Sequence, residues 1–264
     1  MNGGEPPYRK SRNLFANGTI SPMTQPPPTA TVPDKGLIAR AIGIITSPKA
    51  TFETVVAQPK PVAMLFLVCL VLGLAAAIPQ FTDRGRLAAL DMQVKQMEAF
   101  GMNVTPEMYQ SMEKRSVYAG YTTLAGVFIG VPLMTMLFTA LYWAVFNAIM
   151  GGLATFKQVL GVVTHSQVIG ALGAAVAAPI MYAQGVVSTS GPFNLGALVP
   201  FLEPDSVIAK TLGATNVFTL WGLLVTGIGL GVLYKRKGST IGLVLIALYV
   251  VIAAGFFSIF SGRS

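Results

Sequence analysis

The sequence predicts an all-α integral membrane protein: a five-transmembrane-helix bundle with N-terminal interfacial amphipathic helices and a helical extracytoplasmic hairpin. Of its 264 residues, 53% are hydrophobic and only 11% are charged, whereas a typical soluble domain is about 25% charged. Five apolar stretches are long enough to cross a hydrocarbon core of about 30 Å. A soluble domain of this length could not cover its surface with so few charges, so an ordinary cytosolic enzyme is excluded.

The first 34 residues predict a disordered cytoplasmic tail. They contain seven prolines, three of them consecutive, and almost no apolar periodicity. Such a composition does not build a packed core. A Pro-rich segment can serve as the ligand of a partner domain, but we favour the simpler interpretation of an unconstrained tail.

Residues 35–60 predict two short amphipathic helices. Apolar residues of the first recur at helical spacing, at Leu37, Ile38, Ala41, Ile42 and Ile45. The second is expected to begin with Ser47 as its N-cap and Pro48 in its first turn, and Phe52 starts its apolar face. Such helices either lie along the inner membrane interface or pack against the cytoplasmic ends of the bundle, and the sequence leaves both arrangements open.

Residues 61–262 predict the five-span membrane domain. Its spans are expected at about 61–81, 117–150, 162–187, 212–234 and 239–261. The second of these uncharged stretches, residues 117–150, is ambiguous, because a single helix over its 34 residues would be about 51 Å long. It forms either one long helix, tilted or extending into water, or two short spans hinged at residues 130–132.

The distribution of charge favours one helix in this run, and therefore five spans. With five spans, the predicted cytoplasmic side receives 11 Lys and Arg against three Asp and Glu, and the other side receives seven of each. This asymmetry satisfies the positive-inside rule with the N-terminus in the cytoplasm and the C-terminus outside. The net charge of +8 is then an orientation signal, and no nucleic-acid partner is expected.

The 82–116 segment predicts a helical hairpin outside the bilayer. Its first helix is expected from Arg86 to Phe100 and ends at Gly101, and Thr105 caps the second. Five methionines crowd the hairpin, namely Met92, Met97, Met102, Met108 and Met112. Thioethers can bind Cu(I), but the spacing is irregular and no His or Cys lies in the segment. Packing is therefore the favoured interpretation, and no metal or other cofactor is expected.

The spans offer little catalytic chemistry. Cys69 is the only cysteine, so no intrachain disulfide is expected. His165 and Ser166 are neighbours in sequence, so they point in different directions on a helix and do not predict a catalytic dyad. Two faces of small residues predict close helix packing instead: Gly126 with Gly130, and Gly170 with Ala174 and Ala178.

Four short motifs follow one another along this five-span frame. They are Ser47-Pro48 with Phe52 before the first span, the Gly151-Gly152-Leu153-Ala154-Thr155-Phe156-Lys157-Gln158 connection, the Thr164-His165-Ser166-Gln167 start of the third span, and the LEPDS stretch containing Pro204 with Phe218-Thr219-Leu220-Trp221 beyond it. Together, over about residues 36–260, they resemble the Yip-type membrane domain. That family is named for interaction with Rab-type small GTPases in eukaryotic membrane traffic.

The resemblance implies five spans with a cytoplasmic N-terminus, which agrees with the charge count. It also implies a membrane adaptor or organiser rather than an enzyme. The tail lacks the D-L-Y-G-P-type motif of many eukaryotic members, and the Met-rich hairpin is more similar to bacterial relatives. The resemblance therefore points to a bacterial-like member in the inner membrane.

These observations together predict a non-catalytic membrane scaffold or adaptor. Its expected partners are membrane lipids, with membrane or cytoplasmic proteins and a second copy of the chain as candidates. The alternative is a channel or transporter for a small solute or a lipid, because glycine-rich helices and scattered amides could line a path. An intramembrane enzyme is the least favoured interpretation.

Overall fold

The structure, a computed structural model, describes residues 36–185, 191–203 and 206–261. These residues form helices and connections but no strand beyond an isolated bridge between Asn194 and Asn216. In chain order the helical elements are α1 (Leu37–Thr46), α2 (Pro48–Ala57), α3 (Pro61–Ala77), η1 (Ile78–Phe81), α4 (Asp83–Ala99), α5 (Pro106–Ser116), α6 (Ala119–Trp143), η2 (Ala144–Ile149), α7 (Phe156–Gln184), η3 (Leu195–Leu198), α8 (Val207–Ala214), α9 (Val217–Tyr234) and α10 (Gly238–Ser261). The predicted tail, residues 1–34, lies outside the described residues.

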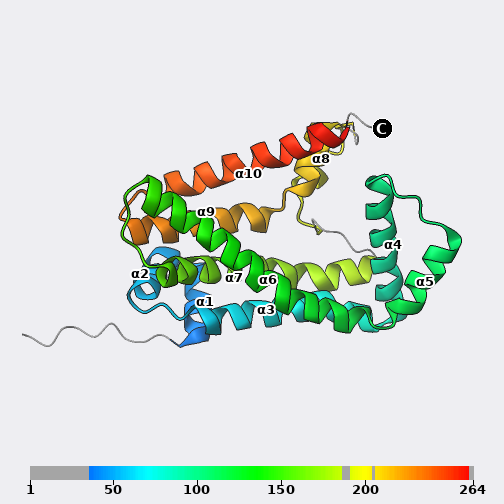
Figure 1. Ribbon diagram of the computed structural model, residues 1–264, viewed down its shortest axis with the longest axis horizontal. Helices are drawn as coiled ribbons and strands as arrows, with labels where there is room; N and C mark the ends of the chain where they lie inside the picture. The colour runs from blue at the N-terminus through cyan, green and yellow to red at the C-terminus, as the bar shows by residue number, and fades with distance from the viewer. Residues whose placement is uncertain (1–35, 186–190, 204–205, 262–264) are drawn as a thin grey trace, which may run out of the picture. The chain divides into compact units, whose positions relative to one another are not determined.

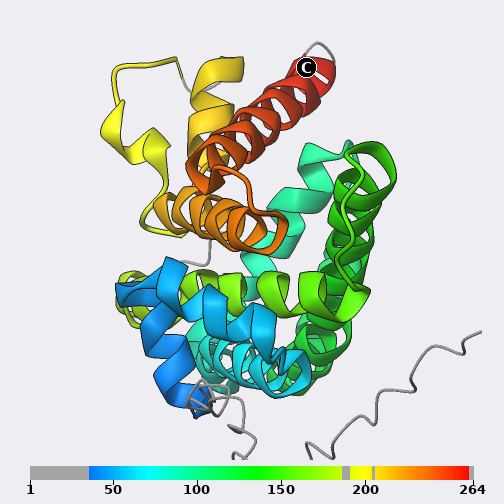
Figure 2. The same ribbon diagram turned by 90° about the vertical axis from the view of Figure 1, so that its left-hand side faces the viewer.

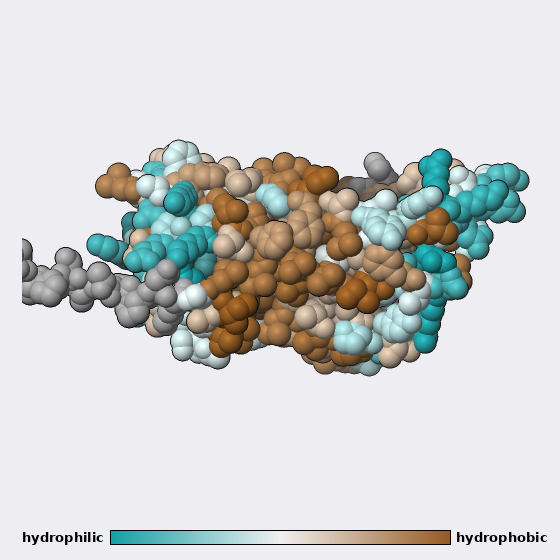
Figure 3. Space-filling model, turned by 90° about the horizontal axis from the view of Figure 1, so that it is seen from below, coloured by the Kyte–Doolittle hydropathy of each residue, from teal (hydrophilic) through white to brown (hydrophobic). Residues whose placement is uncertain are grey.

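Five of the described helical segments are long and apolar enough to cross a bilayer, which confirms the predicted all-α membrane bundle. They are Pro61–Phe81, Ala119–Ile149, Phe156–Gln184, Val217–Tyr234 and Gly238–Ile259. The ambiguous second run is one continuous helical element, α6 followed by the π-helical turn η2. On the face drawn in Figure 3, a hydrophobic band lies between two hydrophilic ends.

Helix α7 is the centre of the bundle. It packs against α1, α2, α3, α6 and α9, whereas α10 packs against α9 and α8. The buried fraction of an 18-residue apolar stretch differs widely among the spanning segments. It is 67% for α7, but only 11% for the second span and 6% for α10. The outer surfaces of α6 and α10 are therefore left to lipid or to other proteins.

The connections gather at two ends of the bundle (Figure 1). The basic end comprises residues 36–60, 150–157 and 235–237, and among its described residues seven Lys and Arg stand against one acid. The hairpin end comprises residues 82–118 and the described part of 191–216, with six charges of each sign. Seen from the basic end, α1 and α2 lie in front of the bundle helices (Figure 2).

Two of the helices that carry the spans begin more than two residues from the predicted starts. Helix α7 begins at Phe156, six residues before the predicted start, because a capping box at Thr155 and Gln158 fixes its first turn. Helix α9 begins at Val217, since α8 ends at Ala214 and the side chain of Asn216 caps the new helix.

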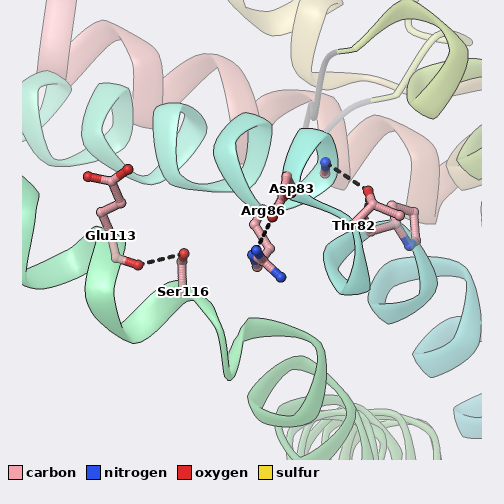
Figure 4. A network of polar contacts seen from close by, with 7 residues as sticks. Thr82, Asp83, Arg86, Glu113 and Ser116 are labelled. Carbon is pink, nitrogen blue, oxygen red and sulfur yellow. Dashed lines mark hydrogen bonds and ion pairs between the residues drawn. The ribbon is translucent and has the colours of Figure 1, made fainter.

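The hairpin end is held by local side-chain bonds (Figure 4). Helix α4 begins at Asp83, three residues before the prediction, because Thr82 Oγ1 accepts a bond from the Gly85 N–H at 3.1 Å. Asp83 and Arg86 form an ion pair one turn apart. The helix ends at the predicted left-handed glycine, Gly101, with φ +78°.

Candidate functional site

Of the predicted motif residues before the first span, Phe52 packs against the bundle, whereas Ser47 is exposed. Phe52 is fully buried, and a Cβ placed on Gly229 of α9 would lie 2.9 Å from two carbons of its ring. Ser47 occupies the N-cap position of α2, but its side chain makes no capping bond. Its carbonyl oxygen instead accepts a bond from the Thr51 hydroxyl at 3.0 Å, and Pro48 occupies the first turn.

Two polar side chains fasten the end of α2. The guanidinium of Arg40 is almost completely buried, and its Nη1 donates to the carbonyl of Gln58 at 2.8 Å. From the start of α7, Nε2 of Gln158 donates to the carbonyl of Val56 at 3.3 Å. These bonds satisfy carbonyls that the end of a helix leaves without partners. Helices α1 and α2 are therefore packed on the bundle, and their location at a membrane interface stays a prediction.

The glycine-rich connection is a closely fitted turn. Gly151 has φ +71°, a conformation that suits glycine. A Cβ on Gly152 would lie 2.5 Å from Cε1 of Tyr234 and 2.7 Å from the carbonyl oxygen of Phe146. The rings of Phe146 and Tyr234 stack with centroids 4.7 Å apart. Glycine is thus required at position 152 because Tyr234 and Phe146 leave no room for a Cβ, and not because of a positive φ.

Two donors from the end of the second span fix the rest of this connection. Nε1 of Trp143 and Nδ2 of Asn147 both donate to the carbonyl of Ala154, at 3.1 and 2.6 Å. Thr155 then caps α7, and Phe156 follows it with 38% of its surface exposed.

His165 is fully buried in α7. Its Nδ1 lies 2.7 Å from the carbonyl oxygen of Gly161, which can only accept, so a neutral ring carries its proton on Nδ1. Ser166 likewise donates to its own helix, to Val162 O at 2.9 Å. Nε2 of His165 has no hydrogen-bond partner within the described part of the chain. The two neighbouring side chains are thus held by their own helix and do not face each other.

The remaining motif residues lie elsewhere. Phe218 packs at the start of α9, where a Cβ on Gly173 of α7 would lie 2.6 Å from its Cγ. Trp221 is one turn further along, with ring centroids 6.1 Å from those of Phe218. Pro204 lies outside the described residues. The motif residues before the first span, the 151–156 connection and His165 are therefore grouped in the half of the bundle at the basic end, while Phe218 and Trp221 are not part of this group.

A cavity of about 550 Å³ lies in the half of the bundle nearest the hairpin end. It is lined by α3, α6, α7 and the first turns of α4 and α9. The small face Gly170, Ala174 and Ala178, predicted to pack helices, lines this cavity instead. At Gly170 no side chain of the described residues covers this face, since an added Cβ would meet nothing within 4 Å.

One cation lies at the rim of this cavity. Nη2 of Arg84 donates to the carbonyl of Ala183 at 2.9 Å, and the guanidinium carbon lies 5.9 Å from the centroid of the Tyr182 ring. No Asp or Glu is among the described residues that line the cavity. The sequence did not reveal Arg84 and Tyr182 as neighbours, because Arg84 meets the end of α7 only in the fold: its bonding partner Ala183 is 99 positions away.

Metal-binding groups do not cluster in the described ranges, where no three His, Cys, Asp or Glu side chains come together. Of the hairpin methionines, Met92 lines the cavity, and Met102 and Met108 are exposed.

Comparisons with known proteins agree with this architecture. The chain is 25% identical over 224 residues to the membrane protein YknW of Bacillus subtilis, an alignment that covers 83% of this chain and 88% of that protein. No solved structure matches the chain. A family model, the Yip1 domain, matches residues 42–261, which include all five spanning helices, and the chain therefore belongs to the Yip1 domain family of membrane proteins.

Proposed function

We propose that the chain is a non-catalytic scaffold or adaptor of the bacterial inner membrane that binds a protein partner at its basic end. The observation that carries this proposal is a set of apolar side chains exposed at that end, where the helices leave the bilayer. Ile38, Ile42 and Leu153 are 58%, 55% and 96% exposed. Exposed apolar residues among basic ones suit a partner with an apolar contact surface and acidic residues around it.

The proposed orientation places the basic end in the cytoplasm. Its excess of Lys and Arg contrasts with the balanced charge of the hairpin end, and cytoplasmic connections carry such an excess. The N-terminal tail then also belongs to the cytoplasmic side.

The hydrogen bonding of the spans supports a role without catalysis. Besides His165 and Ser166, several hydroxyls in the spans donate to carbonyls of their own helix, as Thr139 does to Thr135 at 2.7 Å and Thr226 to Gly222 at 2.8 Å. A nucleophile and a general base need to share a hydrogen bond, and these side chains are used by their own backbones.

Site-specific photocrosslinking in cells tests the partner. A photoreactive side chain at Ile42 or at Leu153 is expected to capture the same protein, identified by mass spectrometry. The same side chain at Leu248, which is exposed in the middle of α10, is the control and is expected to capture lipid. Leu153→Ser should weaken capture from Ile42, whereas Leu248→Ser should not. Lipid adducts alone at all three positions would contradict the proposal.

The cavity favours a second candidate function, a channel or transporter for a small solute or a lipid. Transport requires that the cavity open alternately to both sides. Flux into proteoliposomes that is abolished by Ala174→Leu would favour this function over the scaffold. Undiminished crosslinking to a protein partner, without flux, would favour the scaffold.

A further inference from the structure

The cavity at the hairpin end has the dimensions of one lipid chain. Along α7 its lining extends from Gly170 to Tyr182, about 18 Å at the rise of an α-helix. One leaflet of the hydrocarbon core is about 15 Å thick. A slot of this depth in a membrane-spanning bundle can hold an extended acyl chain.

The lining of the cavity is mostly apolar and leaves room for a guest. Ala75, Ala76, Ala174 and Ala178 face it together with glycines, so the space exists because the side chains are small. Besides Arg84 at the rim, the polar lining residues are Gln80, Asn216 and Thr219. Gln80 is already bonded, to Ala76 O at 2.9 Å and to the Thr123 hydroxyl at 3.2 Å, and Oδ1 of Asn216 accepts from the Phe218 N–H at 2.8 Å. The interior therefore suits hydrocarbon rather than a polar solute.

A lipid can enter from the side. A second apolar hollow of about 590 Å³ between α3 and α7 shares Ala75, Pro79, Ala178 and Tyr182 with the first. The outer rim of this hollow carries exposed apolar residues, with Leu74 42% and Ile78 59% exposed. The two hollows share part of their walls, so the cavity lies next to an apolar hollow on the outer surface of the bundle, from which a lipid chain would enter.

The rim carries the group that would hold an anionic head. The bond to Ala183 uses one of the five N–H donors of Arg84, and the contact with Tyr182 keeps the guanidinium at the mouth. Guanidinium groups bind phosphate through paired N–H donors. With no acid in the described lining, nothing there competes with a phosphate for Arg84.

We propose that this cavity binds one acyl chain of an anionic phospholipid from the leaflet at the hairpin end, with the lipid phosphate on Arg84. The lipid is a bound component of the bundle and fills space that the helices leave open. This site is separate from the proposed partner surface at the basic end, so the two proposals can fail independently.

The test uses the full chain in nanodiscs that contain a phosphatidylglycerol with a diazirine on its acyl chain. Peptide mapping after illumination is expected to find adducts on the lining segments of α3 and α7. Unlabelled phosphatidylglycerol should compete, while phosphatidylcholine should compete about tenfold less well, because it carries no net negative charge. Glycerol phosphate without acyl chains should not compete, which distinguishes a lipid from free phosphate.

Two pairs of variants locate the chain and the head. Ala174 lines the cavity, whereas Ala125 is exposed on α6 and is not among the residues that line either hollow. Ala174→Leu should therefore cut labelling about tenfold or more by overfilling the cavity, and Ala125→Leu should change it little. Arg84→Gln should abolish the preference for phosphatidylglycerol, whereas Arg86→Gln, whose side chain pairs with Asp83, should retain it. Elution as a monodisperse species checks that each variant is folded.

The proposal requires that Ala174→Leu lowers labelling and that Arg84→Gln abolishes the preference for phosphatidylglycerol. Equal competition by phosphatidylglycerol and phosphatidylcholine in the unmodified chain overturns it. If labelling is lost in Arg84→Gln but not in Ala174→Leu, the lipid lies on the rim with its chain outside the cavity. If only Ala174→Leu has an effect, Arg84 is not part of the site. Either result rejects the proposed mode of binding.

Discussion

Phe52 of α2 and Gly229 of α9 are in a contact that leaves no room for a Cβ atom, which would lie 2.9 Å from two carbons of the ring. The ring is fully buried, so it cannot move into solvent to relieve the contact. This contact joins the segment before the first span to the fourth span, and it makes α2 part of the folded core rather than a loose attachment.

The first prediction concerns this contact. Gly229→Ala is expected to lower the free energy of unfolding by about 1–3 kcal/mol, the usual cost of overpacking. The measurement is the midpoint of thermal unfolding of the purified protein in detergent. The matched control is Gly126→Ala in α6, where a Cβ meets nothing within 4 Å and alanine is the better helix former by about 1 kcal/mol. Equal shifts for the two variants would contradict the contact.

The second prediction concerns the buried guanidinium of Arg40. Arg40→Met keeps much of the apolar stem but removes the donor to Gln58 O. A hydrogen bond from a charged group contributes about 1.5–3 kcal/mol, so its loss should make α1 and α2 more susceptible to limited proteolysis. Lys49→Met changes an exposed cation in α2 and should leave the digestion pattern as it is. Identical patterns for both variants would rule out this role for Arg40.

The third prediction concerns the cap of α5. Hydrogen bonds from the Glu107 backbone and from the Thr105 side chain lower the pKa of the Glu107 carboxyl below its ordinary value. Because the pKa is lowered in the folded chain, the contribution of the carboxylate to the cap is present above the ordinary pKa and is lost as the pH falls through the lowered one. Thr105→Ala should therefore move the pKa of Glu107 upward in an NMR titration. A titration curve that does not move would show that the Thr105 bond is absent.

The sequence predicts the spanning helices well because crossing a bilayer requires long uncharged runs, which composition alone reveals. The start of α7 needs more than hydropathy: Lys157 interrupts the apolar pattern, and the capping box at Thr155 and Gln158 decides where the helix begins. That signal is present in the sequence as a Thr followed three residues later by Gln.

The packing of small residues cannot be predicted in the same way. Gly126 and Gly130 have the spacing of a packing face, yet a Cβ on either would meet nothing within 4 Å. Gly229 is the glycine that a ring from α2 contacts. Spacing shows that a face is narrow, but the neighbour that covers it comes from a distant segment, and the same holds for the cavity rim built by Arg84 and Tyr182.

The last prediction concerns the proposed orientation. Cys69 is buried, so it should give little background in labelling with a membrane-impermeant maleimide. Met102→Cys at the hairpin end and Lys237→Cys at the basic end both replace exposed side chains. In intact spheroplasts Met102→Cys should be labelled, while Lys237→Cys should react only after the membrane is permeabilised. An odd number of spans separates the two positions, because three described spanning segments, those of α6, α7 and α9, lie between them. Labelling of both from one side would therefore contradict the five-span topology itself, whereas an exact exchange of the two results would retain five spans and reverse their orientation.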